Sequence, residues 1–256
     1  MTRIALLDGS IGQELVHRAG ERPTPLWSTS VMLDHPDLVG AVHSDYFDSG
    51  ATIATTNTYA VLRDRLQPAG LEERFSDLIE TALTQAEAAC SAHGGGRIAA
   101  SLGPLRASYR PDLCPDEAEA ADAYAEVVDL MKDRVDLFLI ETVASVKHAR
   151  GALMGCVGGG RPVWLSVTVD DEDGTRLRSG EPLSDIAPVL AEFRPDAILA
   201  NCSRPEAIDA ALTVLAPMGL PFGAYANGFT KISDGFLKDR PTVDALEARH
   251  DLNRWK

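Results

Sequence analysis

Cys202 lies in the stretch "ILANCSRPE" (residues 198–206), where an apolar run gives way to polar residues. A thiol at the end of a buried strand could fill the core, attack a substrate or bind a metal. The pKa of a free thiol is about 8.5, so a thiol is a poor nucleophile at neutral pH and needs a partner to react. Each of the three roles therefore requires different residues elsewhere in the chain.

The remaining cysteines and the histidines do not form a recognisable metal-ligand pattern. The sequence contains no Cys-Cys pair and no cysteine after Cys202. Cys90 and Cys156 fall in or near expected helices and Cys114 falls in an expected loop, so we do not assign them as ligands. The six histidines show no paired spacing, and we expect them to be solvated: His17, His35, His43, His93, His148 and His250.

Polar residues also follow several other apolar runs. These polar segments are residues 8–10, 55–59, 101–104, 141–142, 201–203 and 225–228. If the runs are parallel strands of a barrel, their carboxyl ends meet at one face and the polar side chains form a pocket there. The plainer alternative is that an isolated Asp-Gly or Asn-Gly pair is only a turn.

The apolar runs have the length of strands. Seven are found, at residues 4–7, 52–56, 97–102, 137–142, 163–169, 197–201 and 221–225. They are almost continuously apolar rather than alternating, which indicates parallel strands buried on both faces. Helix-like segments separate them, so the sequence predicts strand-helix crossover units and a parallel sheet.

This alternation, with no Gly-x-Gly-x-x-Gly after the first run, favours an α/β fold of the (β/α)8 TIM-barrel type over a doubly wound sheet. A closed barrel of this type has eight strands, and residues 226–256 contain nothing that resembles the eighth. We therefore expect residues 1–256 to form a single barrel domain that is incomplete at its C-terminus.

Composition limits the partners that the chain can have. The 38 acidic residues outnumber the 24 basic residues and give a net charge of -14, which disfavours binding to nucleic acid. No apolar run approaches the roughly 18 residues that a membrane helix needs, and no signal-peptide pattern opens the chain. We expect a cytoplasmic protein whose partners are small molecules, and we leave self-association into a homo-oligomer open.

Several motifs, in order, resemble the homocysteine S-methyltransferase family. They are "LLDGSIGQEL", "PLWSTSVMLDHPDLVGAVHSDYFDSGATIATTNTY", "SLGP", "LFLIETV" and "ANCSRPE", which together run from residue 6 to residue 206. The later stretch "GAYANGFT" is similar to the seventh strand and loop of the family. The second motif, through "TTNTY", is the most specific, and the order and spacing of all five strengthen the resemblance.

The resemblance implies a zinc-dependent transfer of a methyl group from an onium donor, such as S-methylmethionine or a betaine, to the sulfur of homocysteine. In the family, three cysteine thiolates hold the zinc and leave a fourth position for the substrate sulfur, which zinc deprotonates. Cys202 matches the first of these ligands. The other two are an adjacent Cys-Cys pair after the eighth strand, which this sequence lacks, so the resemblance implies a truncated chain with an incomplete zinc site.

The resemblance also implies residues that hold the substrates, although it assigns no catalytic residue beyond the metal ligand. Asp8 and Gly9 would hold the amino acid, and Glu141 would bind its ammonium group, with a structural salt bridge as the alternative role of Glu141. Trp27 would face the onium donor, because an indole attracts cations, or would simply pack in the core or at its rim.

Two asparagines and one loop remain ambiguous from sequence. Asn57 and Asn201 could donate hydrogen bonds to the substrate carboxylate or to neighbouring loops. The segment "DDEDGTRLRSGE" (residues 170–181) is rich in acids, but it lacks the ligand order of a calcium loop and is similar to a barrel loop of the family.

Three functional hypotheses follow. The first is a homocysteine S-methyltransferase-like enzyme with Cys202 as a zinc ligand. The second is a non-catalytic, truncated paralogue or fragment that binds a ligand or a partner through an open barrel edge. The third is an enzyme that does not use zinc and binds another small cation at its acidic mouth.

Overall fold

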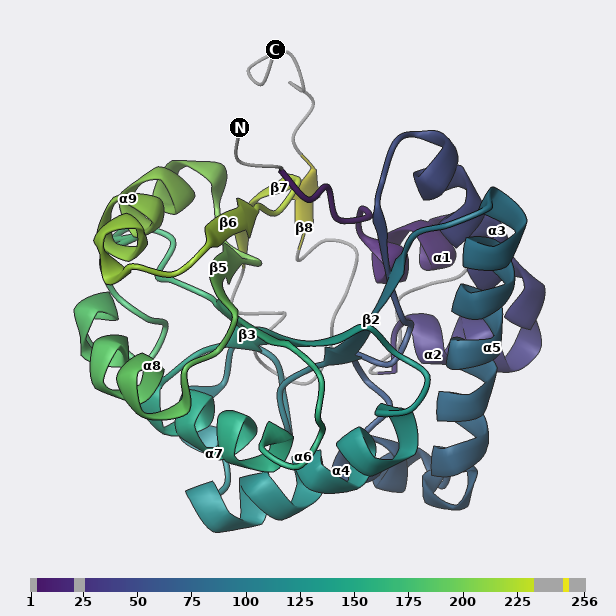
Figure 1. Cartoon of the computed structure of the whole chain (residues 1–256), viewed down its shortest axis with the longest axis horizontal. Helices are drawn as coiled ribbons and strands as arrows, with labels where there is room; N and C mark the ends of the chain where they lie inside the picture. The colour runs from purple at the N-terminus through teal and green to yellow at the C-terminus, as the bar shows by residue number, and fades with distance from the viewer. Residues whose placement is uncertain (1–3, 21–25, 233–245, 249–256) are drawn as a thin grey trace.

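The computed structural model describes residues 4–20, 26–232 and 246–248. Its centre is a curled sheet of six parallel strands, ordered β1 to β6 as in the chain (Figure 1). The strands are β1 (Ile53–Thr55), β2 (Arg97–Leu102), β3 (Leu137–Val143), β4 (Val163–Val167), β5 (Ala197–Asn201) and β6 (Phe222–Tyr225). Each strand pairs with the next in sequence, so six of the seven predicted strands and their parallel arrangement are confirmed.

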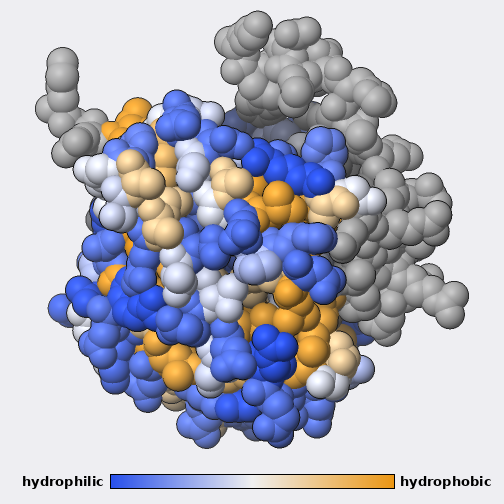
Figure 2. All heavy atoms as spheres, turned by 90° about the vertical axis from the view of Figure 1, so that its right-hand side faces the viewer, coloured by the Kyte–Doolittle hydropathy of each residue, from blue (hydrophilic) through white to orange (hydrophobic). Residues whose placement is uncertain are grey.

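The helices lie on the outside of the curled sheet (Figure 1). They are α1 (Ile11–Ala19), α2 (Ser28–Asp34), α3 (Pro36–Asp48), α4 (Arg63–Leu66), α5 (Phe75–His93), α6 (Glu117–Met131), α7 (Val146–Cys156), α8 (Ala187–Phe193) and α9 (Pro205–Leu215). Short 3-10 turns complete the connections: η1 (Gln67–Ala69), η2 (Glu72–Arg74), η3 (Pro111–Leu113), η4 (Leu183–Ile186) and η5 (Ala216–Met218). On the side that carries α3 and α5, hydrophilic atoms cover most of the surface and hydrophobic atoms form separate patches (Figure 2).

The core lies on both faces of the sheet because successive side chains of a strand point to opposite sides. In β3, Phe138 and Ile140 belong to the large apolar cluster between sheet and helices. Leu137 and Leu139 belong instead to a smaller cluster on the other face, with Ile53, Ala99 and Leu199 from the neighbouring strands. This two-sided burial explains why the strands read as continuous apolar runs.

The prediction of a strand at residues 4–7 is wrong in its length. Only Leu7 forms a bridge, parallel to Ile53 of β1. Backbone hydrogen bonds from Thr52 N to Leu6 O and from Asp8 N to Ile53 O hold the segment beside β1. Ile4 and Leu6 are 89% and 52% exposed, which shows that the other side of this segment has little cover.

The stretch after β6 also differs from the prediction. It contains two short strands, β7 (Phe229–Ile232) and β8 (Leu246–Ala248), which pair with each other antiparallel. Neither joins the parallel sheet among the described residues, so the sheet ends at β6. Across the described ranges, every helix is too short or too polar to cross a membrane.

Two of the five histidines in the described ranges are buried, which corrects the expectation that all are solvated. His43 and His148 are 1% and 3% exposed, whereas His250 lies outside the described residues. His148 accepts a hydrogen bond from Ala144 N at Nδ1 (3.4 Å), so its Nε2–H donates to the Tyr124 hydroxyl at 2.9 Å. That hydroxyl donates in turn to Gly103 O at 2.9 Å. The chain of bonds ties α6 and α7 to the ends of β2 and β3.

This buried chain of hydrogen bonds predicts a stability effect. Tyr124→Phe leaves His148 Nε2–H and Gly103 O without a partner, which should lower the free energy of unfolding by about 1–3 kcal/mol. Urea denaturation followed by circular dichroism measures it. The matched control is Tyr46→Phe, which removes a single long hydrogen bond of 3.4 Å and should cost less. Equal stability of parent and Tyr124→Phe would contradict the role of the chain.

Candidate active site

A cavity of about 300 Å³ lies at the carboxyl ends of the strands. The side chains that line the cavity come from the inward faces of the strands. In β3, the alternation that turns Leu137 and Leu139 inward also turns Glu141 inward at the end of the strand. Thr55 and Ser101 follow Ile53 and Ala99 in the same way. Six of the seven residues predicted for the site line the cavity: Asp8, Gly9, Trp27, Asn57, Glu141 and Cys202.

Glu141 is held by two hydroxyl donors from neighbouring strands. Tyr225 of β6 donates to Oε1 at 2.8 Å, and Ser101 of β2 donates to Oε2. Burial raises the pKa of Glu141, while the two hydrogen bonds act against that shift. No lysine or arginine of the described residues pairs with this carboxylate. Among these residues, Glu141 therefore does not form the structural salt bridge that was its alternative role.

Asp8 is a second buried acid beside the same cavity. Its side chain is 3% exposed, and its two oxygens accept 2.6 Å hydrogen bonds from the backbone N–H and the hydroxyl of Thr55. Burial raises the pKa of Asp8 to about 7; the Thr55 hydrogen bonds oppose this rise, and the charge of Glu141 adds to it. Two carboxyl groups that each resist ionisation favour a bound cation between them.

Gly9 allows the chain to pass close to α3 beside the cavity. A Cβ at this position would lie 2.5 Å from Cε1 of the Tyr46 ring, closer than real contacts allow. A side chain at residue 9 would therefore displace the Tyr46 ring, and the role of Gly9 in holding the amino acid stays a prediction.

Cys202 reaches the cavity from the residue after β5. Its sulfur accepts hydrogen bonds from Thr142 Oγ1 (3.3 Å) and Asn201 Nδ2 (3.1 Å), and a further hydrogen bond links it to Tyr109. Burial raises the pKa of this thiol to about 11, and the hydrogen bond from Thr142 only partly opposes the rise. At pH 7, Cys202 is therefore a neutral thiol.

The backbone is strained where these residues meet. Cys202 and Thr142 have φ angles of 52° and 59°, a region that side chains other than glycine rarely adopt. Trp27 and Tyr109, which line the cavity, also have positive φ angles, 49° and 62°. Such strain costs on the order of 1–3 kcal/mol per residue and concentrates at functional sites. Its clustering at one cavity supports a functional assignment.

The residues around Cys202 do not fit a zinc site. A catalytic zinc ion usually has three protein ligands of the nitrogen, oxygen or sulfur type. In the described ranges, no three His, Cys, Asp or Glu side chains are grouped so as to hold a metal ion. The Cys202 sulfur accepts hydrogen bonds from the hydroxyl and amide donors named above, and such donors stabilise sulfur without binding a cation.

Asn57 and Asn201 use their amides within the protein. Asn57 accepts from Ser28 Oγ (2.5 Å) and donates to Ser28 O (3.2 Å), which ties the end of β1 to α2. Asn201 accepts from Thr142 N (3.1 Å) and donates to the Thr142 hydroxyl (3.1 Å) as well as to Cys202. These contacts favour the loop-holding alternative for both, and Asn201 is absent from the cavity lining.

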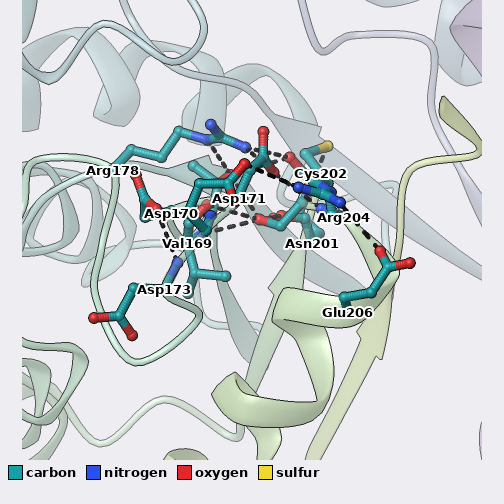
Figure 3. Close-up of polar contacts among 12 residues, drawn as sticks. Val169, Asp170, Asp171, Asp173, Arg178, Asn201, Cys202, Arg204 and Glu206 are labelled. Atoms are coloured by element: carbon teal, nitrogen blue, oxygen red, sulfur yellow. Dashed lines mark hydrogen bonds and ion pairs between the residues drawn. The ribbon is translucent and has the colours of Figure 1, made fainter. Parts of the chain in front are cut away.

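The acidic segment after β4 braces the end of β5 (Figure 3). Arg178 Nη2 and Arg204 N both donate to Asp171 Oδ1, at 2.8 and 3.0 Å. The Arg178 guanidinium also lies 5.0 Å from the centre of the Tyr109 ring. Asp170 accepts from Glu172 N and Asp173 N and so forms a turn, which agrees with the expectation of a barrel loop.

Sequence reasoning placed Ser101 and Tyr225 in polar segments expected at the pocket, but nothing in the sequence linked their hydroxyls to Glu141. Tyr109 lies in the loop between β2 and η3 and follows no periodic pattern, so only the folded chain reveals it. With Trp27 and Tyr59, these tyrosines give the cavity an aromatic wall.

Comparison with known proteins gives similarities over most of the chain. The homocysteine S-methyltransferase family model matches residues 5–253. The homocysteine S-methyltransferase of Escherichia coli (strain K12) is 32% identical over 243 residues, which cover 88% of this chain and 77% of that protein. Homocysteine S-methyltransferase YbgG of Bacillus subtilis (strain 168) is 26% identical over 219 residues, covering 78% and 69%.

A solved structure agrees with these similarities. The crystal structure of the metallated form of the homocysteine methyltransferase MmuM from Escherichia coli matches with a TM-score of 0.80 and 26% identity. The match covers 93% of this chain and 88% of that chain.

The donor set around Cys202 predicts weak metal binding. After dialysis against a chelator and then against zinc-free buffer, we expect the purified chain to hold well under one zinc ion, because one thiol cannot replace the usual three ligands. Atomic emission analysis of the parent and of Cys202→Ala measures the zinc content. Stoichiometric zinc in the parent that is lost from Cys202→Ala would contradict the assignment.

The buried carboxyl of Asp8 predicts a pH-dependent stability. Its folded pKa of about 7 exceeds the ordinary aspartate pKa of 3.8, so the folded state binds the proton more tightly than the unfolded state. The contribution is complete below pH 4 and is lost as the pH rises through 7. Relative to the parent, Asp8→Asn should therefore gain up to about 4 kcal/mol in free energy of unfolding between pH 4 and pH 8.

Urea titrations of both proteins at several pH values measure this difference. Any constant cost of placing an amide beside Thr55 cancels, because only the change with pH is compared. The exposed Asp37→Asn serves as the control and should follow the parent. A difference between Asp8→Asn and the parent that stays constant from pH 4 to pH 8 would contradict the raised pKa.

Proposed function

This chain belongs to the homocysteine S-methyltransferase family, and from that premise we propose that its cavity transfers a methyl group from an onium donor to the sulfur of homocysteine, giving methionine. The observation that carries the proposal is the pair of buried acids, Asp8 and Glu141, beside one cavity with an aromatic wall. Together they suit two cationic groups: the ammonium of an amino acid and the onium centre of the donor.

The two acids would bind the ammonium group of homocysteine. Glu141 is oriented by the hydroxyls of Ser101 and Tyr225, and Asp8 is oriented by Thr55. A hydrogen bond between an ammonium group and a carboxylate contributes about 1.5–3 kcal/mol. Binding would also relieve the cost of burying the carboxylates, because the cation lowers the pKa of both.

The aromatic side chains would bind the methyl donor. Trp27, Tyr59 and Tyr109 line the cavity, and an aromatic face attracts an onium cation by up to about 2 kcal/mol when water is excluded. This supports a donor whose methyl group is attached to positive sulfur or nitrogen, of which S-methylmethionine is the candidate.

The reaction needs little acid-base assistance on the donor side. The S–H bond of homocysteine is replaced by an S–CH3 bond, the donor leaves as a neutral sulfide or amine, and one proton is released. Because the leaving group is neutral, no general acid has to protonate it. The role of the protein is then to align the homocysteine sulfur with the methyl group of the donor and to exclude water.

Zinc, implied by the family resemblance, would make the substrate sulfur more nucleophilic by deprotonating it. Cys202 is the residue that would contribute a thiolate to it. The described residues supply one thiol and no three-ligand group, so we derive no step of the reaction through the metal.

The wider architecture is part of the proposal. Six parallel strands in chain order, with helices outside, support assignment to the (β/α)8 barrel type and to one domain over residues 1–256. We propose small-molecule partners only, in the cytoplasm, without binding to nucleic acid or membranes.

The alternative is a non-catalytic chain that binds a partner through the open edge of its sheet. Ile4 in the first segment and Phe222 in β6 are 89% and 50% exposed. Exposed strand edges with apolar side chains can pair with another chain. A chain without turnover that associates through this edge would favour this alternative.

The proposed function predicts methionine formation that depends on Glu141. With homocysteine and S-methylmethionine, the parent should produce methionine, and Glu141→Gln should raise the KM for homocysteine about 10- to 100-fold by removing the charge that holds the ammonium group. Methionine is quantified by chromatography over a range of homocysteine concentrations.

The control is Glu126→Gln, which removes an exposed partner of Arg63 and should leave the kinetics unchanged. Absence of methionine in the parent, or equal KM values for parent and Glu141→Gln, would contradict the proposed function.

A further inference from the structure

His43 is a buried histidine to which the proposed chemistry assigns no task. It lies on α3 with its side chain completely buried, and neither ring nitrogen has a hydrogen-bond partner among the described residues. A buried polar group without a partner costs about 1–3 kcal/mol, so such a residue needs an explanation.

The surroundings of His43 point to Asp8. Its Nδ1 lies 3.8 Å from Asp8 Oδ2, too far for a hydrogen bond. Oδ2 already accepts from Thr55 N at 2.6 Å, and a carboxylate oxygen can accept a second donor. His43 does not line the cavity, whereas Asp8 does, so His43 would act on a bound substrate through Asp8.

We propose that His43 is a positioning residue that donates a hydrogen bond from Nδ1–H to Asp8 Oδ2 when Asp8 ionises, and so keeps Asp8 charged for the substrate ammonium group. The part of this proposal in which Asp8 binds the substrate ammonium group rests on the proposed function. The ring has to approach by about 1 Å, and catalytic hydrogen bonds are often long in a ligand-free site and shorten on binding. A donor to a carboxylate forms one of the stronger hydrogen bonds in proteins.

The other groups around Asp8 act in opposite directions on its ionisation. Glu141 faces Asp8 from β3 and opposes its ionisation, and Thr55 of β1 supplies two donors. The ring of Tyr46, from the same helix as His43, lies against Gly9, and its hydroxyl donates to Ser10 O rather than to Asp8.

His43 can supply a donor without adding a charge. Burial lowers the pKa of His43 to about 4, so the ring is neutral at pH 7 and carries one N–H. The proposal assigns this hydrogen to Nδ1, the nitrogen nearer to the carboxylate, and an ionised carboxylate can accept it. The geometry thus adds a third donor to a carboxylate that burial would otherwise keep protonated.

The test compares His43→Phe, which keeps a buried ring but removes the donor, with His43→Asn, whose amide can place an N–H near the position of Nδ1. For His43→Phe, the KM for homocysteine should rise about 10-fold with little change in kcat, because a lost hydrogen bond of this kind corresponds to about one decade. The acid limb of kcat/KM should move to higher pH, since Asp8 becomes harder to ionise. His43→Asn should restore both.

The control is His148→Phe, which removes the other buried histidine and its hydrogen bond to Tyr124. It should lower stability but leave the acid limb where it is. If His43→Phe and the parent share the same acid limb, or if His43→Asn behaves like His43→Phe, the proposal is overturned.

A second measurement does not depend on turnover. In the ligand-free chain, carbon-13 NMR of the Asp8 carboxyl group follows its titration directly, and the midpoint in His43→Phe should lie about one pH unit above that of the parent. Equal midpoints would overturn the role of His43 even if the parent makes methionine. A parent without turnover would instead contradict the proposed function and leave this titration to decide the role of His43.

Discussion

Two carboxyl groups buried beside one cavity are the constraint on which the site depends. Asp8 and Glu141 are each held by hydroxyl or amide donors, and burial raises the pKa of both. Neither pairs with a lysine or arginine of the described residues. An uncompensated carboxylate in such a place is costly, so the arrangement favours a ligand that brings its own positive charge. The ammonium group of an amino acid is such a ligand.

The parallel sheet brings these groups together. Alternation along each strand places apolar residues on the inner face and a polar residue at its carboxyl end, as in Leu137, Leu139 and Glu141. The left-handed backbone at Thr142 and Cys202 then directs the Cys202 sulfur toward the same cavity. The hydrogen bonds of Asn201 link these two strand ends, so the strained geometry is held by a buried amide on both sides.

Much of this arrangement could be predicted from the sequence because it depends on local patterns. Six of the seven continuous apolar runs form the strands of the sheet, and residues at or just after their carboxyl ends, such as Glu141 and Cys202, line the cavity. The run at residues 4–7 failed because an apolar run becomes a strand only where a neighbour pairs with it, and only Leu7 forms a bridge. The burial of His43 and the approach of Tyr109 to Cys202 depend on contacts across the fold, which no local spacing encodes.

The central claim is that the buried acids recognise the ammonium group of the substrate. Isothermal titration calorimetry tests it most directly by comparing homocysteine with 4-mercaptobutyrate, which keeps the thiol and carboxylate but lacks the amino group. The account predicts that homocysteine binds at least about 10-fold more tightly, as expected for the loss of one charge-assisted hydrogen bond. Equal affinity for the two compounds would contradict it.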